Sequence, residues 1–402
     1  MKLIDACEII VDCPHSTAKD EGCGIPLVRT PNIGKGRLDL NGVHRVSETV
    51  YNQRNERAVP QFEDLILARE APVGNVAMIT KGQKVCLGQR VVLIRPNKAI
   101  ANPAYLTYYL LSDKVQHRLK NNANGAVVAH LNMNEIRNLE ITLPPLDEQN
   151  RIASILTSID DKIDLNNRIN HNLEEQAQAL YKSWFVDFEP FKDVEFVDSE
   201  LGAIPSNWTV QTADDVFEIN IGKTPPRKEH QWFTNDPSDN IWVSISDMGA
   251  CGMFIYDSSE YLTDEAIKRF NIQMVEKDSV LLSFKLTIGR VAIADTRLTT
   301  NEAIARFILP KPCYREFLYL FLKQYQYGNL GSTSSIATAV NSKTIKGIKL
   351  IVPPYEIISR FNAESKPLFD KINYLTRETN KLISMRDSLL PQLMTGKHSC
   401  FH

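Results

Sequence analysis

The sequence repeats itself at an offset of 209 residues (131 to 340), and this duplication limits the folds that the chain can adopt. LNMNEIRNLEITLPP (131–145) matches VNSKTIKGIKLIVPP (340–354), and the two Pro-Pro pairs coincide. Upstream, DLILAREAPVGNVAMI (64–79) resembles DSVLLSFKLTIGRVAIA (278–294). Matches in the same order along both halves indicate one structural unit that is built twice.

Each repeat combines a variable portion with a long helical segment. Short segments rich in β-branched or aliphatic residues, such as DLILA and RVAIA, predict strands, whereas Tyr105–Leu119 and Arg315–Tyr327 have helical spacing. The sequence therefore predicts an α+β fold with two similar mixed α/β domains, separated by two long helices that pack as an antiparallel coiled coil in a pseudo-two-fold internal repeat. We expect a first domain at 1–145, a first helix at 146–186, a linker at 187–205, a second domain at 206–354, a second helix at 355–395 and a dispensable tail after Lys397.

Both helical segments carry an apolar stripe with heptad spacing, which is typical of helices that pack along one another. About 40 residues at 1.5 Å each give a rod of roughly 60 Å. Asn166 would fix the register of such a pair at some cost in stability. Alternatively, each helix packs on its own domain. The expected pairing residues are Ile152, Ile159, Asn166, Leu173, Leu180, Phe361, Leu368, Leu375, Leu382 and Leu389.

Composition favours a cytoplasmic protein without disulfides or metals. The seven cysteines are scattered and form no CxxC pair, which favours a reducing compartment. Cys13, His15 and Cys23 lack the spacing of metal ligands. The apolar runs are too short to span a bilayer, and the acidic start is unlike a signal peptide. The net charge is −2 and no segment is a strongly basic arm, so local patches would have to hold a nucleic acid.

Three segments closely resemble the specificity subunits of type I restriction-modification systems. They are LPPLDEQNRIASILTSIDDKIDLNNRINHNLEEQAQALYKSWFVDFEPF (143–191), LGAIPSNWTVQTADDVFEINIGKTPPR (201–227) and LISMRDSLLPQLMTGK (382–397). The resemblance extends over essentially the whole chain, and its helix-region motifs are specific to this family.

The resemblance implies that each domain is a target recognition domain that reads one half of a bipartite target in double-stranded DNA. It also implies that the helices set the spacing and dock two methyltransferase subunits, with restriction subunits as further partners. The chain itself would have no catalytic site and no cofactor. Because B-DNA repeats every 10–10.5 base pairs, about 34–36 Å, a spacer of fixed length would also determine the distance between half-sites.

Polar and basic residues in loops between predicted strands are the candidate DNA contacts. Arg can pair bidentately with guanine and Asn or Gln with adenine, while Lys suits phosphates. For any one residue a solvated surface position is the alternative, and we expect about half of the group to face DNA. The candidates are Arg29, Asn32, Lys35, Arg37, Arg69, Gln89 and Arg90 in the first domain, and Lys223, Arg227, Lys228, Ser244, Ser246, Asp247, Lys285, Arg290 and Asn301 in the second.

Gly74 and Gly289 occupy one repeat position and predict a turn that needs a permissive backbone. The alternative is that the missing side chain lets this loop approach DNA closely.

Two other functions remain open. A protein-interaction scaffold is consistent with the balanced charge of residues 206–354. A self-contained methyltransferase is suggested by VPPYE (352–356), which resembles the tetrapeptide of amino-methyltransferases. However, Val352 cannot hold a target amino group, and no glycine-rich cofactor loop precedes a helix, so we expect no such activity from this chain alone.

Overall fold

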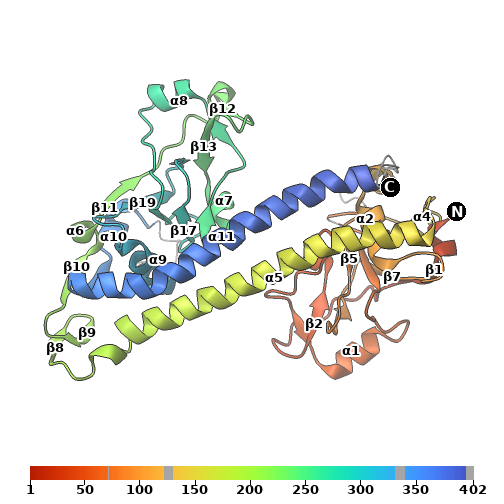
Figure 1. Ribbon diagram of the computed structural model, residues 1–402, viewed down its shortest axis with the longest axis horizontal. Helices are drawn as coiled ribbons and strands as arrows, with labels where there is room; N and C mark the ends of the chain where they lie inside the picture. Colours follow the sequence, from red (N-terminus) through yellow and green to blue (C-terminus); the bar gives the residue numbers. More distant parts are fainter. Residues whose placement is uncertain (71, 122–129, 331–339, 395–402) are drawn as a thin grey trace. The chain divides into compact units, whose positions relative to one another are not determined.

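The computed structural model describes residues 1–70, 72–121, 130–330 and 340–394, which belong to two compact units (Figure 1). The first unit contains Met1–Ile163 together with the C-terminal segment from Lys381, and the second unit contains Asp164–Asn380. Each unit thus combines one globular domain with a segment of both long helices. The tail after Lys397, which we predicted to be dispensable, lies outside the described residues.

The first unit is built on a sheet in the order β1-β7-β4-β5, in which all neighbours are antiparallel. Both faces of this sheet are buried, which explains why its central strands consist almost entirely of Val, Ile, Leu and Ala. One face packs against α2 and α5, and the other packs near a smaller sheet, β3-β2-β6. The strands are β1 (Cys7–Asp12), β2 (Ile25–Val28), β3 (Arg45–Val46), β4 (Leu65–Ala68), β5 (Val76–Met78), β6 (Cys86–Leu87) and β7 (Val91–Pro96).

The helix predicted at Tyr105–Leu119 is divided in two at Ser112. The backbone of Ser112 is extended (φ −64°, ψ 147°), and its hydroxyl donates to the carbonyl of Tyr109 at 2.6 Å. Such a local bond competes with the helical pattern, and the periodicity of the sequence does not reveal it. The helical segments of the first domain are η1 (Leu3–Ala6), η2 (Thr30–Asn32), α1 (Glu48–Arg54), α2 (Pro103–Leu111), α3 (Asp113–Asn121) and α4 (Met133–Arg137).

The second unit has a sheet in the order β11-β19-β16-β17-β14 and a smaller sheet in the order β12-β15-β13-β18. Its strands are β10 (Thr209–Thr212), β11 (Glu218–Ile221), β12 (Phe233–Thr234), β13 (Asn240–Val243), β14 (Phe254–Ile255), β15 (Tyr261–Leu262), β16 (Val280–Ser283), β17 (Val291–Ala294), β18 (Thr299–Thr300), β19 (Ile304–Ile308) and β20 (Lys349–Val352). Its shorter helical segments are α6 (Ala213–Val216), η4 (His230–Trp232), α7 (Ile245–Ala250), α8 (Asp264–Arg269), α9 (Tyr314–Gln324), η5 (Tyr327–Leu330) and α10 (Ser342–Lys346).

The duplicated sequence forms a duplicated topology, which confirms the predicted internal repeat. The order β1-β7-β4-β5 recurs as β11-β19-β16-β17. The parallel pair β2–β6, in which Leu27 faces Cys86, recurs as β13–β18, in which Trp242 faces Thr299. Strand β14, which pairs in parallel with β17, corresponds to a single parallel bridge between Gly36 and Ala77.

The two long helices, α5 (Leu146–Phe185) and α11 (Tyr355–Met394), pack antiparallel within each unit (Figure 1). In the first unit, Arg386 Nη1 donates to Asp160 Oδ1 at 3.0 Å. In the second unit, Asn166 Nδ2 donates to Glu378 Oε2 at 2.7 Å. Farther along α5, Trp184 packs edge-on against Phe361, which lies near the start of α11. Later residues of α5 thus contact earlier residues of α11, as expected for an antiparallel pair.

The residues predicted to pair the helices all lie on covered faces. Ile152, Ile159, Asn166, Phe361 and Leu375 are buried, and Leu173, Leu180, Leu368, Leu382 and Leu389 are half-buried. Both predicted arrangements occur together: the helices pack along one another, and each helix also packs on a domain. Ile152 joins the core of the first domain, against which Leu390 of α11 also packs, and Phe361 joins the core of the second domain together with Trp184. Each stripe is therefore shared between a domain and the other helix.

The segment predicted as a linker at 187–205 has regular structure. It contains η3 (Glu189–Phe191) and an antiparallel hairpin of β8 (Phe196–Ser199) and β9 (Gly202–Pro205). Phe191 packs against Trp208 with ring centroids 5.0 Å apart, so the segment adds to the core of the second unit. Residue 395, the last of the predicted second helix, lies outside the described residues, and the domain boundaries remain predictions.

Candidate nucleic-acid interface

Nine of the sixteen candidate DNA contacts, three in the first unit and six in the second, lie at one end of the main sheet of their unit. In the first unit this end consists of the loops after β1 and β4 and the loops before β5 and β7, which we call the first loop end (residues 12–17, 69–70, 72–75 and 88–90). The corresponding second loop end consists of residues 222–228, 284–290 and 301–303. Antiparallel neighbours bring these loops together although they are far apart in sequence.

A chain of polar contacts crosses the first loop end. Arg69 donates from Nε to the carbonyl of Leu131 at 2.8 Å and from Nη1 to Asp12 Oδ2 at 2.6 Å. Its third contact joins Nη2 to His130 Nε2 at 2.7 Å. The other nitrogen of His130 lies 2.9 Å from Glu70 Oε1. Since Arg69 is buried and has all these partners, it anchors the interior, contrary to its prediction as a DNA contact.

Arg90 differs from Arg69 because its side chain is exposed. Its Nε lies 2.9 Å from Glu70 Oε2, and its backbone is left-handed, with φ +67°. Gln89 next to it is half-buried and accepts from the Thr17 hydroxyl at 3.1 Å. Arg90 and Gln89 therefore remain candidate contacts at the first loop end.

Four further candidates of the first domain follow β2. Asn32 accepts from the backbone N–H of Arg29 at 3.0 Å, which closes a helical turn. Arg29 is half-buried beside Gly88, and Lys35 is exposed. Arg37 donates to Asp161 of α5 at 2.7 Å, so its guanidinium joins the domain to the helix. Of these four, Lys35 has the most exposed side chain, and Arg37 and Asn32 have structural contacts.

Three basic candidates lie in the first part of the second loop end. Arg227 stacks over Phe233 and Trp242, with its guanidinium carbon 4.3 and 4.4 Å from the two ring centroids, and it makes two 2.9 Å bonds to Glu260. Lys223 donates to the carbonyl of Phe270 at 3.2 Å, and Lys228 is exposed. These contacts hold Arg227 in one orientation, while both lysines leave charge at the surface.

Several other candidates of the second domain support the loops rather than project from them. Ser244 caps α7 and donates to Asp247 Oδ2 at 2.6 Å. Burial opposes the charge of Asp247, but donation from Ser244 and Ser259 keeps its pKa below the ordinary value. Arg290 Nη1 donates to the carbonyl of Ile245 at 2.5 Å, and Asn301 Oδ1 accepts from the N–H of Ala303 at 3.0 Å. Ser246 and Lys285 are exposed.

Gly74 and Gly289 both have φ +89°, as the prediction of a permissive turn requires. A Cβ at Gly74 would lie 2.9 Å from the side chain of Gln116, and one at Gly289 would lie 2.9 Å from the ring of Tyr327. The close approach at each glycine is therefore made to the protein itself.

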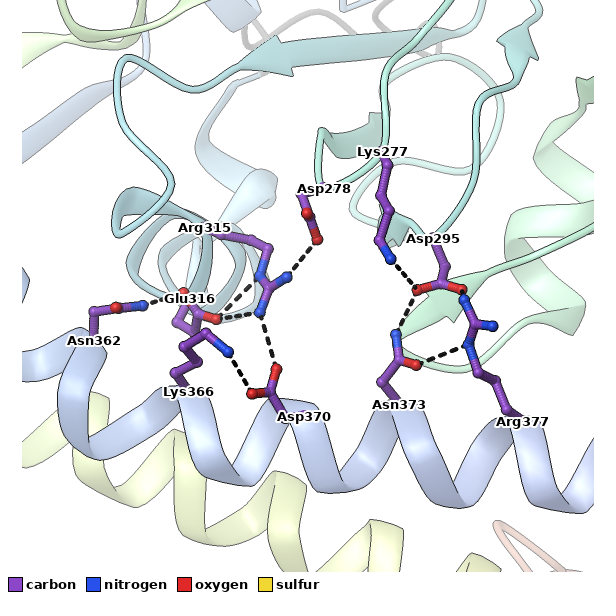
Figure 2. A network of polar contacts seen from close by, with 10 residues as sticks. All are labelled: Lys277, Asp278, Asp295, Arg315, Glu316, Asn362, Lys366, Asp370, Asn373 and Arg377. Atoms are coloured by element: carbon purple, nitrogen blue, oxygen red, sulfur yellow. Dashed lines mark hydrogen bonds and ion pairs between the residues drawn. The ribbon is translucent and has the colours of Figure 1, made fainter.

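Sequence reasoning missed a polar network that fixes α11 to the second domain (Figure 2). The buried carboxylate of Asp295 accepts from Asn373 Nδ2 at 2.6 Å and from Arg377, and Lys277 Nζ lies 3.9 Å away. Asn373 and Arg377 are one turn apart on α11 (Figure 2). This spacing is visible in the sequence, but the loop that supplies Asp295 is not predictable from it.

The same network has a second centre at Glu316, which is 1% exposed. Glu316 accepts from Arg315 Nη2 at 2.6 Å and from Asn362 of α11 at 2.7 Å (Figure 2). Burial raises the pKa of Glu316, and the neighbouring Arg315 opposes that rise. The two centres together tie α11 to the second domain at two points along the helix.

Comparison with known proteins assigns the chain to a family. A family profile described as the type I restriction modification DNA specificity domain matches residues 1–175 and 205–383, which is most of the chain. This chain is a type I DNA specificity subunit. Its similarity extends to the MjaIX specificity subunit of Methanocaldococcus jannaschii, which is 28% identical over 89% of this chain and 82% of that protein. The HindI specificity subunit of Haemophilus influenzae is 25% identical over 77% of this chain and 80% of that protein.

The fold of the specificity subunit also has a solved counterpart. The crystal structure of the type I S subunit from M. genitalium has a TM-score of 0.59 and 14% identity, and the match covers 98% of this chain and 95% of that one. At this identity the likeness establishes the fold alone, and it confirms the predicted α+β architecture.

Membership of this family makes the chain a recognition subunit rather than a catalytic one, with DNA and a restriction-modification complex as its classes of partner. Across the described ranges of the specificity subunit, no group of three His, Cys, Asp or Glu side chains could hold a metal ion. Within the same ranges, no helix is both long and apolar enough to cross a membrane.

Proposed function

We propose that each domain of this specificity subunit reads one half of a bipartite DNA target through its loop end. The observation that carries the proposal is the same sheet order in both units with different side chains at the matching loops. Arg90 with Gln89 occupies the first loop end, and Lys223 with Lys285 occupies the second. One scaffold with different loop chemistry suits two readers of different sequences.

The charge of the chain is consistent with contacts that depend on local patches. The net charge of the chain is −2, so electrostatic attraction over the whole molecule is weak. Exposed cations such as Lys223, Lys228 and Lys285 would contact phosphates, which position the protein without reading sequence. Base readout would then depend on the polar side chains beside them.

We further propose that the paired helices set the half-site spacing and dock two methyltransferase subunits. Leu165 of α5 and Tyr374 of α11 occupy the same repeat position and are both exposed, at 43% and 59%. Large apolar side chains that recur at equivalent exposed positions suit two copies of one partner. Restriction subunits would join through the complex so formed.

Methylation mapping tests the proposal most directly. The chain is co-expressed with its methyltransferase subunit in a host that lacks other modification, and methylated positions are then read across the genome. We expect one split motif with a fixed spacer. Exchange of residues 206–354 for those of a different specificity subunit should change one half of the motif only. Methylation without sequence preference would contradict the proposal.

The scaffold alternative predicts a different result. If the domains bind peptides, the purified complex should bind all duplexes equally, and the domain exchange should leave the methylation pattern unchanged.

A further inference from the structure

The hairpin between β16 and β17 displays an unusual leucine. Leu286 is 98% exposed, and the next most exposed large apolar side chain of the described ranges is Tyr374, at 59%. The backbone of Leu286 is left-handed, with φ +60°, a conformation that bulky residues rarely adopt. Exposure and backbone strain are both unfavourable, and strained residues cluster at functional sites.

The tip that carries Leu286 has a firm base. Ser283 Oγ donates to the carbonyl of Thr287 at 2.6 Å and accepts from the N–H of Arg290 at 3.1 Å. On one side of the tip Phe284 is buried, and on the other Ile288 packs against the core of the second unit. Residues 285–287 thus form a tip between two anchored positions, and Leu286 projects from this tip into solvent.

The surroundings of Leu286 favour DNA over a protein as its partner. Lys285 precedes it in the hairpin, and Lys223 and Lys228 belong to another loop at the same end of the sheet. The acidic side chains here, Glu260 and Glu302, are bonded to Arg227 and Thr224. A protein-docking patch usually covers several hundred Å² of apolar surface, which a single leucine cannot provide. Proteins that deform DNA need only one aliphatic side chain to enter a base step.

We propose that Leu286 is a wedge that inserts between two adjacent base pairs of the half-site bound by the second domain. The side chain partly unstacks that step, and Lys285 neutralises a phosphate beside it. Steps that unstack easily would be preferred, which adds a specificity determinant without a hydrogen bond to a base. This inference rests on the proposed function, since it requires that the second loop end faces DNA.

The test uses the full chain in complex with its methyltransferase subunits and a duplex that carries the mapped target. 2-Aminopurine replaces one base at a time along the half-site of the second domain. The base that the methyltransferase flips out for modification is left unlabelled. At the remaining positions of the wild-type complex we expect fluorescence to rise at one step, which reports unstacking. Leu286→Ala should abolish the rise and weaken binding about tenfold or more, as loss of one such contact would. Leu286→Met should retain both signals.

Two further variants separate loss of the wedge from loss of the fold. Leu286→Gly suits the left-handed backbone, so its thermal midpoint should not fall while its DNA signal disappears. Phe62→Ala removes a half-exposed apolar side chain that precedes β4 in the first domain and should change neither signal. An abasic site at the responsive step should restore the affinity of Leu286→Ala, because that step is already unstacked.

The outcomes are distinct. If the wild-type complex prefers no sequence, the proposed function fails. If it is specific but Leu286→Ala binds equally well and fluorescence is unchanged, the wedge alone is wrong. If Leu286→Ala reduces co-purification with the methyltransferase while the fluorescence rise persists, the leucine docks a protein, and the wedge is again overturned.

Discussion

At the scale of single residues, burial separates arginines that hold the fold from those that can meet a ligand. The side chain of Arg69 is 7% exposed and that of Arg90 is 56% exposed. Sequence position does not distinguish them, because Arg69 directly follows the buried strand β4 and Arg90 directly precedes the buried strand β7. Arg69 has a carboxylate, a carbonyl and a histidine as partners, and a buried arginine needs them all. Its role is therefore stability.

Replacement of Arg69 by Met should lower the free energy of unfolding by about 3 kcal/mol, because the carboxylate of Asp12 loses its arginine in a mostly buried site and keeps only His15, 3.1 Å away. Urea denaturation of the full chain measures this loss. The matched change Arg90→Met, at an arginine that is mostly exposed, should cost about 1 kcal/mol or less. Equal losses for the two variants would contradict the assignment.

Buried thiols should make stability depend on alkaline pH. Burial raises the pKa of Cys86 and of Cys251 from 9.0 to about 11. Between these values the unfolded chain loses thiol protons that the folded chain keeps, so stability should fall as pH rises from about 9 to about 11. Urea midpoints measured across this range check the expectation. The double variant Cys86→Ala, Cys251→Ala should have a shallower decline.

At the scale of elements, the two halves of the helix pair solve one packing problem with different chemistry. Asp160 and Arg386 form a 3.0 Å ion pair between α5 and α11 in the first unit, where Tyr108 also donates to Asp160 at 2.6 Å. The repeat places Phe369 and Ala177 at the matching positions, and both are buried in the core of the second unit. The interface between the long helices therefore accommodates an ion pair at this position of the first repeat and an apolar contact at the matching position of the second repeat.

Removal of one partner of this ion pair should be costly, whereas replacement of the whole cluster should not. Arg386→Met should lower the free energy of unfolding by about 3 kcal/mol, since it leaves the buried Asp160 without its cation. The triple variant Asp160→Phe, Arg386→Ala, Tyr108→Phe copies the apolar solution and should return close to the wild-type value. Urea denaturation measures both.

An exposed ion pair on the same helix provides the control. Lys366 and Asp370 are each 53% exposed, so Lys366→Ala should change stability by about 0.5 kcal/mol or less. A triple variant as unstable as Arg386→Met would show that the polar cluster is required for helix pairing.

At the scale of the whole molecule, the proposed DNA contacts should appear in the salt dependence of binding. Lys223→Ala, Lys228→Ala and Lys285→Ala should each weaken binding to all sequences alike and reduce the slope of log K against log salt by about 1. Affinity of the complex across a potassium chloride series measures the slope. Lys366→Ala, where the lysine pairs with Asp370, should leave the slope unchanged. A slope reduced only by the control would contradict the second loop end as a DNA surface.

The duplication made much of the fold predictable. Similar segments in the same order forced two similar domains, and heptad spacing in residues 146–186 predicted a long helix that packs along a partner. The candidate site was less predictable, because Arg, Asn and Ser in loops serve both as caps and as contacts. Ser244 and Asn32 both bond to nearby backbone or side-chain groups instead of projecting outward.

The sequence alone determined the repeat, the two long helices and the family, because periodicity and motif spacing are local properties of the chain. Only the tertiary structure decided which charged side chains are buried. Arg37 meets Asp161, 124 residues away, and Arg69 meets the carbonyl of Leu131, 62 residues away. Burial and pairing depend on contacts between distant segments, and the strand order that creates those contacts is a property of the folded chain.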